Sequence, residues 1–106
     1  MFNGFFSKKD YDLDGKTFRE KFENTNEAVL LDVRTPAEFN SGSISGAKNI
    51  DFMSPDFQNR IQALDKDKTY FLYCRSGNRS GNAASVMEKA GFKSFSLVGG
   101  IGAWPK

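Results

Sequence analysis

A short apolar run, Tyr70–Tyr73, stops at the only cysteine of the chain, Cys74, and this run limits the possible folds more than any other segment does. Aromatic and apolar residues in so short a run predict a buried β-strand. The sequence then turns polar, and the segment Asn82–Ala90 predicts a helix that ends at Gly91. The cysteine therefore lies between a strand and a helix, where loop amides and the positive end of the helix dipole face the centre of the loop.

This position predicts a reactive thiol. Only the thiolate is a good nucleophile, and a cysteine pKa of ~8.5 falls to about 3.5–7.5 at helix N-termini or beside cations. Lowering the pKa by two units needs roughly 2.7 kcal/mol of stabilisation of the thiolate. A helix end typically supplies about 0.3–1 kcal/mol, and up to ~2 kcal/mol where it is partly buried. Loop amides and Arg75 or Arg79 must therefore supply the remainder. We expect an ionised Cys74 in an anion-binding loop; the alternative is a small, inert, buried side chain.

Hydrophobic patterning predicts four more strands and three more helices along the chain. The strands are Tyr11–Leu13 (an edge strand), Ala28–Val33, Ala47–Ile50 and Phe92–Val98. The helices run from the N-cap Asp14 to about Asn24, from the capping box Thr35–Glu38 to the break at Asn40–Ser43, and from Ser54–Pro55 along a stripe of Phe57, Ile61 and Leu64. Such alternation with short connections predicts an α/β fold with an open parallel sheet, whose ligands bind at the carboxyl ends of the strands.

Length and composition limit the function classes. The 106 residues suit a single domain, residues 1–106, and a net charge of +2 gives no electrostatic argument for nucleic-acid or membrane binding. One cysteine excludes an internal disulfide and a multi-cysteine zinc site, and we expect neither metal nor cofactor. The first residues lack the apolar region of a secretory signal, no stretch reaches membrane-span length, and an unpaired reactive thiol suits a reducing compartment, so we expect a cytoplasmic protein.

The chain contains no histidine. This absence excludes a Cys-His protease, a Ser-His-Asp hydrolase and a histidine-ligated metal centre. Catalysis must therefore depend on the thiolate, carboxylates, arginines and amides. Attack by a thiolate that is already ionised needs no separate base.

Four segments resemble, in order, the motifs of a single rhodanese-homology domain. They are Leu31–Phe39, Gly46–Ile50, the loop Cys74–Arg79 and the ending Leu97–Trp104. The resemblance implies a five-stranded, mostly parallel sheet with helices on both faces. It also implies sulfurtransfer: the loop cysteine takes a sulfane sulfur from a small anionic donor such as thiosulfate, becomes a persulfide, and passes the sulfur to cyanide or to a thiol, including that of a protein. Many family members have Gly-His-Ile-Pro-Gly-Ala where this chain has Gly42-Ser-Ile-Ser-Gly-Ala47.

The predicted site consists of Cys74 as the catalytic residue and a substrate-binding set around it. That set is Arg75, Ser76, Gly77, Asn78, Arg79 and Ser80. The two arginines would bind the anionic donor, since cations at a helix start oppose its dipole unless an anion is present. Residues 76–78 would act through backbone N–H groups, and Gly77 is the position expected to need a positive φ.

Three other side chains have structural predictions. Asp32 and Arg34 are two apart at a strand end and so on one face, where we expect an ion pair that supports the loops. Trp104 is expected to fill core space rather than contact substrate.

Two other functions remain open. Cysteine phosphatases and arsenate reductases also hold a cysteine in a loop before a helix. In their loop five residues separate the cysteine from an arginine, whereas here four residues separate Cys74 from Arg79 and position 80 is serine. The shorter loop would better suit a single sulfur atom than a tetrahedral phosphate. The other possibility is a non-enzymatic module for partner binding or redox sensing.

Overall fold

The computed structural model describes residues 10–106. In chain order the elements are β1 (Asp12–Leu13), α1 (Gly15–Glu23), β2 (Ala28–Asp32), α2 (Pro36–Ser41), β3 (Lys48–Asn49), α3 (Phe57–Gln62), β4 (Thr69–Tyr73), α4 (Asn78–Lys89), β5 (Lys93–Leu97) and the 3₁₀ helix η2 (Ile101–Ala103). The strands form one five-stranded sheet in the order β1-β5-β4-β2-β3, with every neighbouring pair parallel. The predicted α/β class, strand number and edge position of β1 are confirmed.

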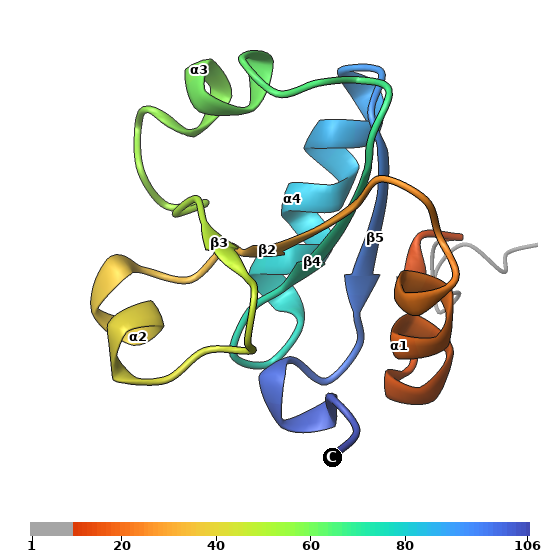
Figure 1. Cartoon of the computed structure of the whole chain (residues 1–106). Coiled ribbons are helices and arrows are strands. Elements are labelled where there is room, and N and C mark those ends of the chain that lie inside the picture. Colours follow the sequence, from red (N-terminus) through yellow and green to blue (C-terminus); the bar gives the residue numbers. More distant parts are fainter. Residues whose placement is uncertain (1–9) are drawn as a thin grey trace, which may run out of the picture.

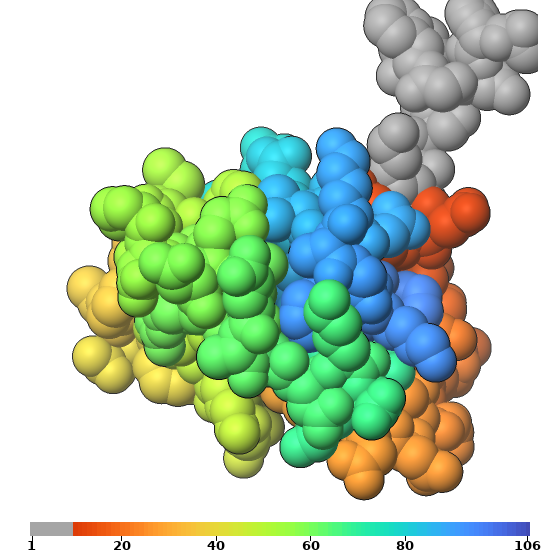
Figure 2. Space-filling view, turned by 90° about the horizontal axis from the view of Figure 1, so that it is seen from above, coloured from red at the N-terminus to blue at the C-terminus, as the bar shows by residue number. Residues whose placement is uncertain are grey.

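Helices cover both faces of this sheet (Figure 1). On one face, α1 and the C-terminal segment pack against β4 through Phe18, Phe71 and Trp104. On the other face, α3 and α4 pack through Ile61 and Met87. Seen from above, the green α3 segment lies beside the blue end of α4, with which it shares one apolar cluster (Figure 2). The central strand β4 is thus buried on both faces, as its continuous apolar sequence predicts.

Local capping explains where two helices begin. The carboxylate of Asp14 accepts the N–H of Thr17 at 2.9 Å, and α1 follows. The hydroxyl of Thr35 accepts the N–H of Glu38 while the Glu38 carboxylate accepts the N–H of Thr35, which is the predicted capping box. Both predictions are confirmed.

The predicted start of α3 is wrong by about three residues. The segment around Ser54 and Pro55 forms turns, because the Ser54 hydroxyl accepts the N–H of Asp56 and its carbonyl accepts that of Phe57. The helix begins at Phe57, and Phe57 and Ile61 are buried as the stripe predicts. Leu64 follows the helix and packs against the same core.

The predicted start of α4 is also wrong, by four residues. The helix begins at Asn78 rather than Asn82, after Gly77 with φ 105°. Its first turn closes when the N–H of Gly81 bonds to the carbonyl of Gly77 at 3.0 Å. The helix therefore begins with residues that include Asn78, Ser80 and Gly81, although these have low helix propensity. Arg79 and Ser80 consequently lie in its first turn.

Two findings concern membranes and metals. Within residues 10–106, no helix is long and apolar enough to cross a membrane. The same residues contain no group of three or more potential metal ligands. The expectation about a secretory signal falls on residues 1–9, which lie outside the described part.

Candidate functional site

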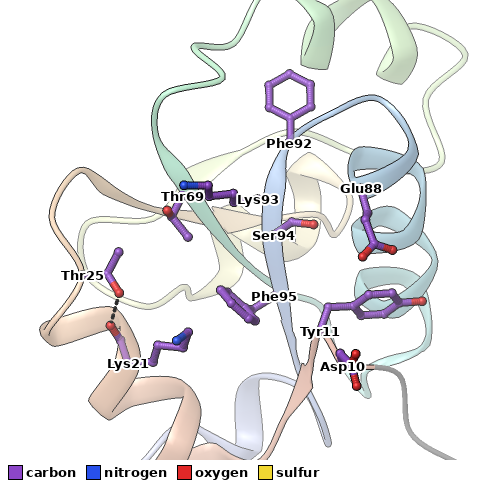
Figure 3. A pocket seen from close by; sticks show the side chains of 10 residues that line it. All are labelled: Asp10, Tyr11, Lys21, Thr25, Thr69, Glu88, Phe92, Lys93, Ser94 and Phe95. Carbon is purple, nitrogen blue, oxygen red and sulfur yellow. Dashed lines mark hydrogen bonds between the residues drawn. The ribbon is translucent and has the colours of Figure 1, made fainter.

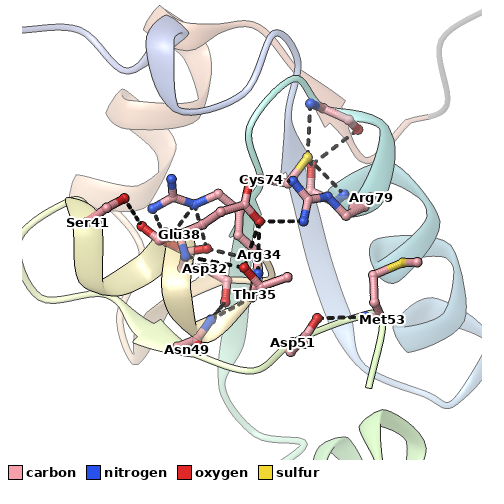
Figure 4. A network of polar contacts seen from close by, with 12 residues as sticks. Asp32, Arg34, Thr35, Glu38, Ser41, Asn49, Asp51, Met53, Cys74 and Arg79 are labelled. Carbon is pink, nitrogen blue, oxygen red and sulfur yellow. Dashed lines mark hydrogen bonds and ion pairs between the residues drawn. The ribbon is translucent and has the colours of Figure 1, made fainter. Parts of the chain in front are cut away.

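Cys74 directly follows β4, at the carboxyl end of the central strand, and α4 begins four residues later. The parallel sheet brings this end of β4 beside the ends of β2 and β5. Cys74 is 1 % exposed. Its Sγ accepts the N–H of Gly77 at 3.0 Å and that of Ser80 at 3.4 Å (Figure 4). The predicted position between strand and helix, with amides directed at the sulfur, is confirmed.

Two buried hydroxyl groups extend this arrangement. The Oγ of Ser80 lies 3.5 Å from the sulfur, 3.2 Å from the Gly77 carbonyl oxygen and 2.8 Å from the Oγ of Ser96 on β5. Ser80 belongs to the predicted set, whereas Ser96 does not. Its position in a strand far along the chain gave no local signal.

The surroundings of Cys74 favour the thiolate. Burial by itself raises the pKa of Cys74, but hydrogen bonds from the Ser80 hydroxyl and from the amides of Ser80, Gly77 and Ser76 together outweigh it. The pKa therefore lies below that of an ordinary thiol. Hydrogen bonds are thus the main cause of the lowered pKa of Cys74, whereas the sequence predicted contributions from both the loop amides and Arg75 or Arg79.

The segment after β5 fixes the loop by backbone contact. The N–H of Ile101 donates to the carbonyl of Cys74 at 2.8 Å. A Cβ on Gly100 would lie 2.0 Å from the carbonyl oxygen of Arg75, and Gly100 has φ 76°. Gly77, with φ 105°, turns the chain into α4 as predicted. Glycines at these positions allow two backbones to touch around the sulfur.

Arg79 points across the site to α2. Its Nη1 and Nη2 donate to the two carboxylate oxygens of Glu38 at 2.8 and 3.0 Å (Figure 4). The hydrogen bonds from Arg79, then from the Thr35 amide, lower the pKa of Glu38 to about 2. From the sequence only a capping role was predicted for Glu38, because no local pattern relates it to a residue 41 positions later.

The other loop side chains differ from Arg79. Arg75 is exposed and makes no side-chain hydrogen bond or ion pair within residues 10–106. Ser76 and Asn78 flank Gly77 and line, with Val98, a hollow of 350 Å³ on one side of the loop. The predicted set is thus gathered around one loop, but only Arg75 leaves its guanidinium open to a ligand.

Asp32 and Arg34 form the predicted ion pair. The Nη2 of Arg34 lies 2.7 Å from Oδ2 of Asp32, which is fully buried. The same nitrogen donates to the carbonyl of Gly42 at 2.6 Å, so the pair connects β2 to the segment after α2. Asn49 of β3 donates to the carbonyls of Asp32 and Arg34 at 2.9 Å. These contacts support the loops without reaching the sulfur.

The lining of a separate hollow of 390 Å³ includes no residue of the loop 74–80 (Figure 3). Thr69 and Lys93, the first residues of β4 and β5, line it, together with Phe92 and Phe95. This places the hollow toward the amino ends of the strands, opposite the cysteine. It contains no thiol.

Comparisons with known proteins agree with this geometry. Residues 15–106 match the sequence pattern of the rhodanese-like domain family. The chain is 40 % identical over 86 residues to the putative sulfurtransferase YtwF of Bacillus subtilis, which covers 81 % of this chain and 82 % of that protein. It is 39 % identical over 79 residues to the thiosulfate sulfurtransferase GlpE of Stutzerimonas stutzeri, covering 73 % of this chain and 70 % of that protein.

Solved structures agree as well. A rhodanese-related protein from Thermoplasma volcanium superimposes with a TM-score of 0.75 at 29 % identity, covering 88 % of each chain. A rhodanese-like domain protein from Staphylococcus aureus has the same fold, with a TM-score of 0.76 at 24 % identity over 90 % of this chain and 91 % of that one.

Proposed function

This chain belongs to the rhodanese-like domain family, and we propose that it transfers sulfane sulfur through a persulfide on Cys74. The relatives that it resembles include proteins named as sulfurtransferases. The observation that carries the proposal is the sulfur of Cys74 at the end of β4, within hydrogen-bond reach of two amides and a hydroxyl. A group of donors around one sulfur stabilises negative charge both on a thiolate and on the sulfur leaving group of a persulfide.

We infer that thiosulfate is a donor. The Cys74 thiolate attacks the outer sulfur of thiosulfate, a new S–S bond forms, and the S–S bond of the donor breaks with its electron pair leaving on sulfite. The product is an anionic persulfide, so charge is conserved and no proton is needed. This step suits a site without histidine, because no general base takes part.

The second step returns the enzyme to its first state. Cyanide or an external thiolate attacks the terminal sulfur of the persulfide, and the electron pair of the broken S–S bond returns to Sγ of Cys74. The chain has no second cysteine that could resolve the persulfide, so the acceptor must be another molecule. A thiol-bearing protein belongs to that class of acceptor.

Arg75 is the proposed contact for the anionic donor. Its side chain is exposed, within one residue of the nucleophile, and not engaged by a carboxylate in residues 10–106. Arg79 has a different proposed role, since its pairing with Glu38 holds the first turn of α4 against α2. Its charge still acts on the sulfur from that position.

The test combines intact-mass spectrometry with product analysis. Protein incubated with thiosulfate should gain the mass of one sulfur atom and should lose it, with formation of thiocyanate, when cyanide is added. The variant Cys74→Ala should do neither. Wild-type protein that gains no sulfur from thiosulfate would contradict thiosulfate as donor, and a sulfur gain that persists in Cys74→Ala would contradict the assignment of the nucleophile.

The same samples separate the two other functions. Release of phosphate from an aryl phosphate, without sulfur gain, would identify a cysteine phosphatase. Absence of both activities in a folded protein would favour a binding or sensing module.

A further inference from the structure

Ser96 on β5 is a buried serine outside the loop, and its hydroxyl lies 2.8 Å from that of Ser80. We propose that Ser96 is a positioning residue for Cys74: its hydroxyl donates to Ser80 and so turns the Ser80 hydroxyl toward the sulfur when the sulfur is ionised. The inference concerns the same sulfur as the proposed function. It rests on the proposed function only for the expectation that a change in the Cys74 thiolate changes sulfur transfer.

The role follows from the number of hydrogen-bond donors and acceptors around the Ser80 hydroxyl. Ser80 has one hydroxyl proton and three neighbouring acceptors: the sulfur at 3.5 Å, the Gly77 carbonyl at 3.2 Å and Ser96 Oγ at 2.8 Å. When Cys74 carries its proton, the thiol can donate to the Ser80 oxygen, and Ser80 is free to donate elsewhere. When Cys74 is ionised, the thiol donates nothing and the sulfur needs a donor.

Ser96 can donate the hydrogen bond that the Ser80 oxygen loses when Cys74 ionises. Its hydroxyl makes no other side-chain hydrogen bond within residues 10–106. It can therefore direct its proton to the Ser80 oxygen in place of the lost thiol proton. An oxygen that accepts a hydrogen bond becomes a stronger donor through its own proton, so the Ser80–sulfur bond is strengthened.

Burial makes this chain of hydroxyls effective. Ser80 is 0 % and Ser96 is 1 % exposed, so bulk water does not replace either partner. Hydrogen bonds that are shielded from water polarise one another more than exposed ones do. Loss of the Ser96 hydroxyl should therefore weaken the hydrogen bond from Ser80 to the sulfur and make the Cys74 thiolate less stable.

The charged groups around the sulfur come from other elements. Arg79 on α4 acts on the sulfur through its charge and is paired with Glu38 on α2. Arg75 in the loop is exposed, the Asp32–Arg34 pair lies at the end of β2, and Asp12 of β1 lies opposite Ser96 in the sheet. None of these residues hydrogen-bonds to Ser96. A substitution at Ser96 leaves their charges and their pairing in place.

The experiment measures the alkylation rate of Cys74 by iodoacetamide as a function of pH, on the full chain. For Ser96→Ala we expect the rate profile to move to higher pH, with a rate about threefold lower below the midpoint, where the rate is proportional to the thiolate fraction. Ser94→Ala is the matched control. Ser94 lies on the same face of β5 and is also buried, but its hydroxyl donates to the carbonyl of Ala84 at 3.0 Å. Its profile should match that of wild type.

A second pair of variants removes the effect of packing. Thr and Val have the same shape, so Ser96→Thr should keep the profile closer to wild type than Ser96→Val does. A wild-type profile in Ser96→Ala, an equal shift in Ser94→Ala, or equal profiles for Thr and Val would each overturn the role of Ser96. Alkylation requires no sulfur transfer, so a protein that fails to form a persulfide but shows these shifts would contradict the proposed function alone.

Discussion

At the scale of single residues, the cysteine is controlled mainly by neutral donors. The amides of Gly77 and Ser80 reach Sγ at 3.0 and 3.4 Å, and the hydroxyl of Ser80 lies at 3.5 Å. Such donors cost no desolvation of a second charge, whereas a buried cation would. This leaves the exposed cation Arg75 available for a ligand.

Substitution of Arg75 tests that division of roles. Arg75→Ala should raise the KM for thiosulfate about tenfold and change kcat less, because it removes a charge-assisted contact to the bound donor. Initial rates across a range of thiosulfate concentrations measure both constants. Lys89→Ala, at the opposite end of α4, is a control that should leave both unchanged. A fall in kcat with KM unchanged would instead assign Arg75 to the chemical step.

Gly100 gives a second prediction at this scale. Gly100→Ala should lower the melting temperature and the rate of persulfide formation, because the new Cβ would meet the Arg75 carbonyl oxygen at 2.0 Å and must displace the loop. Its φ of 76° adds strain of about 1–3 kcal/mol for a residue with a side chain. Gly102→Ala is the control, since a Cβ there meets no atom within 4 Å. Equal behaviour of the two variants in thermal unfolding and in mass spectrometry would contradict the backbone contact.

At the scale of elements, the pair Glu38–Arg79 joins α2 to α4. The Glu38 carboxylate completes the capping box with Thr35 and also accepts two hydrogen bonds from Arg79. One carboxylate therefore stabilises the start of one helix and positions the first turn of another. The side chains of Arg79 and Glu38 are 25 % and 27 % exposed, so the pair is partly shielded from solvent.

The pH dependence of stability follows from this pair. The pKa of Glu38 is about 2 in the folded chain, below its ordinary value of 4.5. Because the folded-state value is the lower one, the stabilisation is complete above about pH 4.5 and is lost as the pH falls toward about 2. Urea unfolding at several pH values should show this loss in wild type, and Glu38→Gln should lose less over the same interval. An unchanged slope in Glu38→Gln would mean that other carboxylates account for the acid sensitivity.

At the scale of the whole molecule, the sheet separates two apolar clusters that together hold β4. Tyr70 and Leu72 pack on the face covered by α3 and α4, and Phe71 and Tyr73 pack on the face covered by α1. The strand that ends at Cys74 is thus fixed from both sides. Rigidity of the strand keeps the sulfur in register with the first turn of α4.

Phe71 is the residue that tests this packing. Phe71 is fully buried and its ring contacts those of Phe18, Phe22 and Phe95 at centroid distances of 5.3–5.5 Å. Phe71→Ala should reduce the free energy of unfolding by about 3–5 kcal/mol. Met53→Ala is the control, because Met53 is 66 % exposed and its loss should change stability by less than about 0.5 kcal/mol. A loss below about 1 kcal/mol for Phe71→Ala, read from urea unfolding, would show that the core relaxes around the gap.

Local sequence patterns were enough to predict the order of strands and helices along the chain and the place of Cys74 between a strand and a helix. The apolar run before Cys74, the caps at Asp14 and Thr35, and the positive φ of Gly77 are local features, and each follows from a few neighbouring residues. Periodicity and capping act over single turns, so a sequence pattern can reveal them. The parallel sheet then follows from alternation of the elements.

Which side chains meet at the sulfur depends on the packing of segments that are far apart in the sequence. Arg79 pairs with Glu38, Ser80 with Ser96, and Gly100 touches Arg75, and none of these pairs is close in sequence. The early start of α4 has the same origin, because contacts with β5 and the turn after it outweigh the low helix propensity of its first residues. Contacts between distant segments depend on how the strands are ordered in the sheet, and local propensity contains no information about that order.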